Sequence, residues 1–75
     1  MTNAIRETVA GSVRAEMARA RCTQKKLARK LGYKTQQSIS RRLCGDVPFT
    51  VDELAAIAAE LGCDITLFFT AGSNP

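Results

Sequence analysis

The sequence predicts an all-α fold, a compact bundle of about five short helices. Apolar residues recur at spacings of three and four through most of the chain, and strand-like alternation never lasts more than a few residues. Threonine or aspartate precedes four of the apolar segments, as expected of helix N-caps, and glycine ends three of them. With 75 residues, 45% of them hydrophobic, the chain can bury one modest core. We therefore expect a single domain over residues 1–70 and a flexible tail over residues 71–75.

The first expected helix is marked by a stripe of apolar residues whose spacing places them on one face. The stripe consists of Ile5, Val9, Val13, Met17 and Ala20. Gly11 lies inside it and weakens a helix by about 1 kcal/mol relative to alanine. A break near Gly11 and Ser12 is therefore an open alternative.

The next two expected helices form a pair. Thr23 is the expected N-cap of the first, which ends at Gly32, and Thr35 is the expected N-cap of the second, which ends at Gly45. Because the connection between them is very short, these two helices cannot lie flat against each other. The sequence thus predicts a helix-turn-helix over about residues 23–44.

The fourth expected helix has the strongest local signature. Thr50 and Glu53 have the spacing of a capping box, and Phe49 can pack on the fourth residue of the helix as a hydrophobic staple. Gly62 is expected to end this helix, and Asp64 is expected to cap a last short helical turn.

The charge is distributed unevenly. All 11 basic residues precede position 43, where only two acidic residues oppose them, so residues 1–45 carry a net charge of +9. Residues 46–75 hold five acidic residues and no basic one. The strong positive electrostatic field of residues 1–45 favours a polyanionic partner. A basic face that serves only solubility is the alternative, and composition alone does not separate the two.

Residue types that most enzyme and metal sites need are missing. The sequence has no histidine, which is the usual general base and the commonest metal ligand. Its three cysteines, Cys22, Cys44 and Cys63, form no CxxC pair and are expected to be reduced, half-buried apolar residues. We therefore expect no enzyme and no cofactor, metal or small-molecule ligand.

The third expected helix displays side chains that suit DNA reading. If its apolar pair, Ile39 and Leu43, faces inward, a turn of about 100° per residue directs Gln37 and Arg41 outward. Gln36 projects from the first turn. Glutamine pairs with adenine, and arginine with guanine, through two hydrogen bonds each. No acidic residue stands between positions 16 and 46, so nothing on this segment repels phosphate.

The same residues resemble a known family. TQKKLARKLGYKTQQSISRRLCG is similar to the helix-turn-helix of the Cro/CI-type, or lambda-repressor-like, regulators of phages and bacteria. TQQSI at residues 35–39 is similar to a recognition helix of that family, and TVDELAAIAAELG and DITLFF are similar to its fourth and fifth helices. The resemblance covers about residues 9–69, and it implies the lambda-repressor-like fold and double-stranded DNA as the partner.

The resemblance also implies which residues contact DNA. Gln36 and Gln37 match the base-reading pair of the family, and Arg41 matches a third base-contacting position. Gln24 matches a phosphate-binding residue at the start of the second helix, where free N–H groups favour an anion. Further contacts with the DNA backbone are expected from Lys25, Lys34, Thr35, Ser38, Ser40 and Arg42.

Two features depart from the family pattern. Seven steps separate Gly32 from Ile39 where six are usual, so the turn is one residue longer and the separate roles of Gln36 and Gln37 are open. The loop after Gly45 is DVPF rather than basic, so the phosphate contacts usual in that loop are not expected.

Two side chains keep alternative roles. Arg42 is as well placed to pair with Glu53 or Asp46 as to reach a phosphate. Leu67 stands in a run of three bulky apolar residues and belongs either to the core or to a subunit interface.

These observations predict sequence-specific binding to the major groove of double-stranded DNA. The expected role is a small phage or bacterial transcriptional regulator, a repressor that acts by covering a promoter. One short helix reads only a few base pairs, so we expect a homodimer on a palindromic operator. The alternatives are a protein-interaction module on the same scaffold, such as an antitoxin, and an architectural DNA binder indifferent to sequence.

The expected location is the cytoplasm, at the nucleoid, or the cytoplasm of the host cell if a phage encodes the protein. No apolar run approaches the roughly 20 residues of a membrane span, so no membrane partner is expected. The N-terminal stretch carries Glu7 and lacks the apolar segment of a secretory signal.

Overall fold

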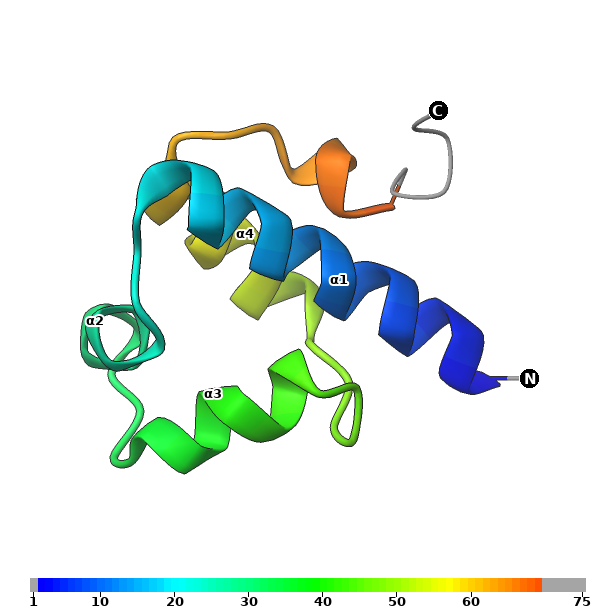
Figure 1. Ribbon diagram of the computed structural model, residues 1–75, viewed down its shortest axis with the longest axis horizontal. Helices are drawn as coiled ribbons and strands as arrows, with labels where there is room; N and C mark the ends of the chain where they lie inside the picture. The colour runs from blue at the N-terminus through cyan, green and yellow to red at the C-terminus, as the bar shows by residue number, and fades with distance from the viewer. Residues whose placement is uncertain (1, 70–75) are drawn as a thin grey trace.

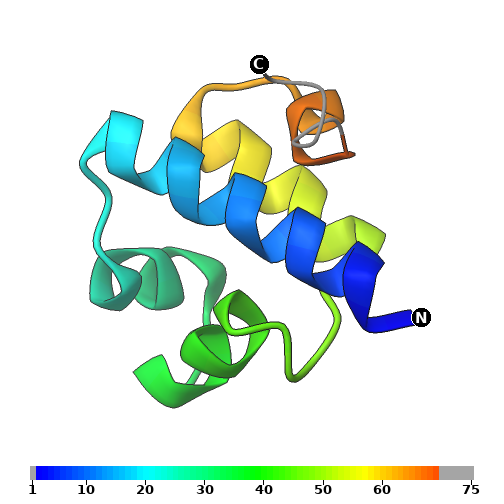
Figure 2. The ribbon, with the colours of Figure 1, turned by 45° about the vertical axis from the view of Figure 1, so that its right-hand side comes forward.

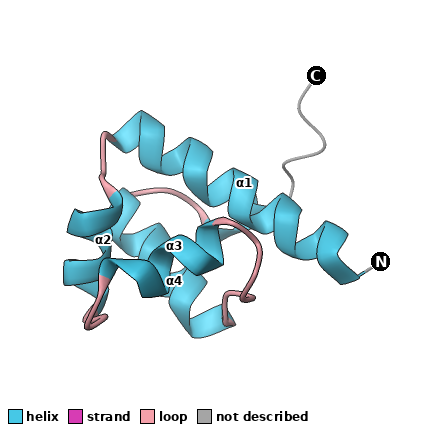
Figure 3. Ribbon diagram, turned by 60° about the horizontal axis from the view of Figure 1, so that its bottom comes forward, coloured by secondary structure: helices cyan, strands magenta, loops and turns pink. Residues whose placement is uncertain are grey.

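The computed structural model describes the backbone of residues 2–69 and the side chains of residues 5–69. The helices are α1 (Thr2–Ala20), α2 (Gln24–Leu31), α3 (Gln36–Leu43) and α4 (Val51–Leu61), followed by a 3₁₀ segment, η1 (Ile65–Phe69). The described part of the chain contains no strand, so the all-α prediction is confirmed (Figures 1 and 3). The tail expected over residues 71–75 lies outside the described residues.

The helices are arranged around a central pair. α1 and α4 lie side by side, with η1 on one side of this pair and with α2 and α3 on the other (Figures 1 and 2). α3 packs mainly against α2 and α1. As a result, α3 lies at the edge of the molecule, opposite η1, where one of its faces meets solvent.

One hydrophobic core joins all the helices, because each presents an apolar stripe to the same interior. Its members with a large, fully buried side chain are Val13, Leu27, Ile39, Ile57 and Phe68. Phe49, the expected staple residue, packs against this core while half-buried, and so do Cys22 and Cys63. The predicted staple residue therefore lies where the local sequence pattern places it. The half-burial expected of the cysteines holds for Cys22 and Cys63 but was wrong for Cys44, which is exposed.

α1 corrects two expectations. It runs without interruption through Gly11 and Ser12, so the break considered there is absent. Of the predicted apolar stripe, Val9, Val13 and Met17 are buried, but Ile5 is 70% exposed and Ala20 is also exposed. The inward placement of Ile5 and Ala20 was wrong because helical spacing identifies a face but not how far the core extends along it. The N-terminal turn of α1 projects past the other helices (Figure 1).

The N-caps differ in how they work. The hydroxyl of Thr23 accepts the N–H of Lys26 at 3.1 Å, and Thr50 and Glu53 form the full predicted capping box, with hydrogen bonds of 3.0 and 2.8 Å. Thr35 occupies the N-cap position of α3, but its side chain accepts no backbone N–H. The side-chain cap expected of Thr35 is therefore absent, and the first N–H groups of α3 are not covered by it.

The C-terminus of α1 offers a stability prediction. Arg21 holds the left-handed position there with φ 55°, a conformation that costs a residue with a Cβ roughly 1 kcal/mol relative to glycine. We expect Arg21→Gly to raise the free energy of unfolding by about 0.5–1 kcal/mol, measured by urea denaturation. Arg21→Ala removes the same charge but keeps the Cβ, so it is the control. An equal gain in both variants would assign the effect to charge instead of backbone strain.

Candidate nucleic-acid interface

α3 presents a polar face to solvent because its apolar residues anchor it from behind. Ile39 and Leu43 are 0% and 2% exposed, whereas Gln36, Gln37 and Arg41 are exposed, as the helical phase predicts. Within residues 5–69, the side chains of Gln36, Gln37 and Arg41 have no hydrogen-bond or ion-pair partner. Two amides and a guanidinium therefore remain available to a ligand.

The start of α2 is tied to α3 through Gln24. The Ser40 hydroxyl donates to the side-chain carbonyl oxygen of Gln24, and both residues are half-buried. This hydrogen bond orients the Gln24 amide and leaves its NH₂ group to donate elsewhere. Lys25, the next residue, is exposed.

A basic hollow of about 290 Å³ lies where α2 meets the start of α3. It is lined by Lys25, Ala28, Arg29, Tyr33, Lys34, Thr35 and Gln36. Three of these residues are cationic and none is acidic. The first N–H groups of α3, which the Thr35 side chain does not cap, add positive partial charge at the same end. The hollow therefore has the chemistry of an anion site.

Arg29 in this hollow is a residue that the sequence analysis did not single out. It follows Lys25 by four positions and so lies on the same face of α2. This four-residue spacing from Lys25 was the sequence signal that could have identified Arg29. The remaining predicted hydroxyls are close by: Thr35 Oγ1 and Ser38 Oγ are 3.4 Å apart, with Thr35 exposed and Ser38 half-buried.

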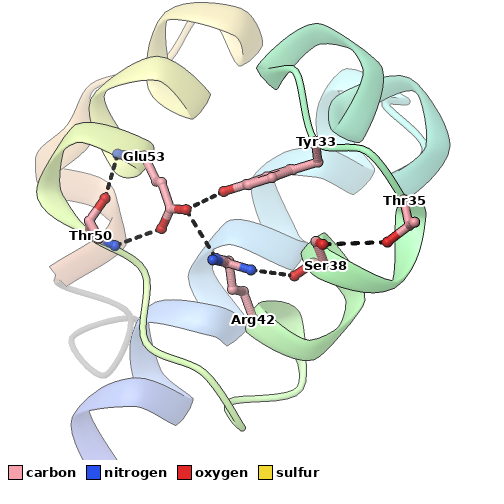
Figure 4. Close-up of polar contacts among 6 residues, drawn as sticks. All are labelled: Tyr33, Thr35, Ser38, Arg42, Thr50 and Glu53. Atoms are coloured by element: carbon pink, nitrogen blue, oxygen red, sulfur yellow. Dashed lines mark hydrogen bonds and ion pairs between the residues drawn. The ribbon is translucent and has the colours of Figure 1, made fainter.

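Arg42 is half-buried, and its side chain points toward Glu53 (Figure 4). Its neighbour Arg41 is exposed. The Nε of Arg42 donates to Oε2 of Glu53 at 3.0 Å, and its Nη1 donates to the Ser38 carbonyl oxygen at 2.7 Å. Its guanidinium carbon lies 5.0 Å from the centre of the Tyr33 ring, a cation–π distance. Of the pairings considered from sequence, the one with Glu53 is present.

Glu53 accepts hydrogen bonds from three directions. Oε2 accepts from the Tyr33 hydroxyl and from Arg42, and Oε1 accepts the Thr50 N–H (Figure 4). Partial burial by itself would raise the pKa of Glu53, but the hydrogen bonds from Tyr33 and Thr50 and the charge of Arg42 together lower it. Burial and the Glu53 carboxylate raise the pKa of Tyr33 to about 12. At neutral pH a neutral phenol therefore donates to a charged carboxylate.

The lowered pKa of Glu53 predicts acid sensitivity. A carboxyl whose pKa is lower in the folded state stabilises the fold above its usual pKa, and this contribution is lost as the pH falls through the folded value. Between about pH 5 and pH 3, the free energy of unfolding should therefore decrease more steeply in the wild type than in Glu53→Gln. Urea denaturation at a series of pH values measures both slopes. The lowered pKa of Asp64 contributes equally to both proteins, and parallel curves would contradict the prediction.

Two arginines of α1 donate hydrogen bonds at the C-terminal end of α3 and in the loop that follows it. Arg14 donates to the carbonyl oxygen of Leu43, the last residue of α3, and Arg6 donates to the Asp46 carbonyl oxygen at 3.3 Å. Carbonyl groups at a helix C-terminus carry negative partial charge, so cationic donors stabilise them. α3 is thereby attached to α1 at its C-terminal end as well as through its buried face.

A family comparison bears on this arrangement. A helix-turn-helix family model matches residues 13–68, well over half of the chain. The chain belongs to the Cro/CI-type helix-turn-helix family. The lambda-repressor-like fold expected from sequence is thus confirmed, and α2, the turn and α3 are its helix-turn-helix. No match was found among curated proteins or among solved structures.

Membership in the Cro/CI-type family identifies the ligand of the chain as double-stranded DNA. The protein is a transcriptional regulator that binds double-stranded DNA, and the family is a regulatory family, not a family of enzymes. Within residues 2–69, no helix is long and apolar enough to cross a bilayer. The described residues include no group of three potential metal-ligating side chains.

Proposed function

We propose that this regulator binds a specific DNA sequence by inserting α3 into the major groove. The observation that carries the proposal is the outward face of α3, where Gln36, Gln37 and Arg41 are exposed and uncommitted to partners within residues 5–69. Base reading needs free donors and acceptors at the groove, and glutamine and arginine form two-bond pairs with adenine and guanine. A helix face that only contacts water does not require side chains that form two-bond pairs with bases.

The phosphate contacts are proposed on either side of α3. The Gln24 amide, oriented by Ser40, donates from the start of α2. The basic hollow supplies Lys25, Arg29 and Lys34, none of which has an ion-pair partner in the described part of the chain. Thr35 and Ser38 add hydroxyl donors at the same end of α3. Contacts of this kind set the position of the protein on the duplex without reading its sequence.

We propose repression by occlusion as the regulatory outcome, in a phage or a bacterium. A protein seated in the major groove covers both the bases and the phosphates of its site. Polymerase cannot occupy the same promoter DNA at the same time. Binding and repression should therefore rise together with protein concentration.

We also propose that two copies bind one palindromic site, because one helix reads only a few base pairs. An exposed apolar surface supports a second copy. Ile5, Val51 and Phe69 are 70%, 71% and 53% exposed, and they flank a hollow of about 270 Å³ between the N-terminal ends of α1 and α4 and η1. Apolar side chains gathered around a hollow are typical of a contact surface.

Selection of bound sequences from a pool of random duplexes tests these proposals. The expected result is an enriched site with two inverted half-sites about 34 Å apart, roughly one helical turn. A single enriched half-site would support base reading and contradict the homodimer. Tight binding that depends on salt but enriches no sequence would replace the proposal with an architectural role. Negligible DNA affinity even at low salt would replace it with the protein-interaction module.

A further inference from the structure

α3 contacts α4 through a small group of polar side chains. Tyr33 in the turn, Arg42 on α3 and Glu53 on α4 meet around a single carboxylate oxygen, and we call these three residues the positioning cluster (Figure 4). α3 packs mainly on α2 and α1, so this cluster supplies a third attachment on the remaining side. Three attachments in different directions restrict the rotation of a helix about its own axis.

Arg42 is the residue that ties α3 to the rest of the cluster. It uses two donors, one to Glu53 at 3.0 Å and one to the Ser38 carbonyl oxygen at 2.7 Å, and it lies over the Tyr33 ring. The Arg42 and Glu53 side chains are only 22% and 20% exposed. A planar guanidinium can make these contacts at once, and a lysine ammonium cannot reproduce them.

Tyr33 ties the turn to the same carboxylate. Its N–H donates to the Ala28 carbonyl oxygen at 2.9 Å, which completes the C-terminal cap of α2 beyond Gly32. Its hydroxyl donates to Glu53. Tyr33 is therefore held by α2 through its backbone and by α4 through its side chain. Tyr33 thereby links the turn between α2 and α3 to α4.

We propose that Tyr33, Arg42 and Glu53 are positioning residues that set the orientation of α3 and thereby the sequence preference of the regulator. This inference rests on the proposed function, because it concerns which bases Gln37 and Arg41 reach. In this proposal Arg42 acts inward on Glu53 and Tyr33, in place of the phosphate contact considered from sequence. A small rotation of α3 moves the tips of its side chains out of the roughly 3 Å range of base hydrogen bonds. Long, flexible side chains still reach phosphates after such a rotation, so discrimination falls before general DNA affinity does.

The test compares Arg42→Gln, Glu53→Gln and Tyr33→Phe with Lys34→Gln as the matched phosphate-contact control. Binding to the selected site and to an unrelated duplex is measured over a range of salt concentrations, with folding checked by circular dichroism. For Arg42→Gln and Glu53→Gln we expect the ratio of the affinity for the selected site to that for the unrelated duplex to fall roughly tenfold. In the double variant this ratio should fall no further than in either single variant. The slope of log affinity against log salt concentration, called the salt slope, should stay at the wild-type value in these variants. Lys34→Gln should instead lower the salt slope by about one and preserve the affinity ratio.

Glu53→Gln separates positioning from simple electrostatics by the sign of its effect. It removes a negative charge, so electrostatics alone would tighten binding to every duplex. Positioning instead predicts weaker binding to the selected site. Tighter binding to all duplexes, or a salt slope that falls by about one in Arg42→Gln with an unchanged affinity ratio, would overturn the inference. Tyr33→Phe keeps the ring under Arg42, so it provides a milder variant if either charge substitution prevents folding.

Amide hydrogen exchange of the free protein tests the cluster without DNA. In Glu53→Gln, the amides of α3 are expected to exchange faster while those of the inner turns of α4 keep their wild-type rates. Unchanged exchange in α3 would overturn the inference. A wild type that shows no sequence preference would instead refute the proposed function, and the exchange rates would still decide whether the cluster holds α3.

Discussion

Phe68→Ala is expected to remove most of the stability of the fold at 25 °C. Phe68 is 0% exposed, and η1 carries it into the core between α1 and α4. Truncating a buried phenylalanine to alanine costs about 3–5 kcal/mol, because it removes the buried ring and leaves a cavity. A domain of 75 residues has on the order of 5 kcal/mol of stability in all. Urea denaturation followed by circular dichroism measures the loss.

The neighbouring residue provides the control. Phe69 has the same side chain in the same 3₁₀ segment, but it is 53% exposed. Phe69→Ala should therefore cost less than about 1 kcal/mol. Equal losses in the two variants would contradict the structure of η1, since the difference depends entirely on which of the two rings faces the core.

Arg41→Ala and Gln37→Ala are each expected to weaken binding to the preferred DNA site by about 1–3 kcal/mol. Each substitution removes a donor group that faces solvent and has no partner within residues 5–69. Because base contacts carry sequence information, each variant should lose discrimination at its own base pair. Repeating the duplex selection with each variant identifies the base pair, and equilibrium titration gives the affinity.

Lys34→Ala is the comparison for these two variants. Lys34 is exposed at the basic hollow, where a phosphate contact carries no sequence information. Losing the Lys34 side chain should weaken binding to all duplexes alike. It should also lower the slope of log affinity against log salt concentration by about one. If Gln37→Ala, Arg41→Ala and Lys34→Ala all had the same uniform effect, α3 would not be the reading helix.

The helices and the outward face of α3 could be predicted because their signals are local. The capping box of Thr50 and Glu53 spans four residues, and the phase of α3 follows from Ile39 and Leu43 alone. Thr35 illustrates the limit of local patterns. It stands at the predicted N-cap position, yet its hydroxyl lies 3.4 Å from Ser38 Oγ and accepts no N–H of α3.

Contacts between separate helices could not be chosen from sequence. Arg42 had three open roles, a phosphate contact or a pair with Glu53 or Asp46, and the choice depended on which way α3 is turned against α4. Tyr33 had no predicted role, because its partner Glu53 lies 20 positions away. Arg14 likewise reaches the end of α3 from α1 across 29 positions.

The amino-acid sequence alone determined that the chain is all-helical, where most helices begin and end, and that two amides and a guanidinium lie on the outer face of α3. These properties arise from neighbours within one or two helical turns, where 3.6-residue periodicity and capping chemistry apply. Only the tertiary structure decided that Ile5 lies outside the core and that Arg42 turns toward Glu53. Both depend on how far separate helices overlap and on the angle at which they cross. Neither the overlap nor the angle follows from the local sequence patterns that mark a helix.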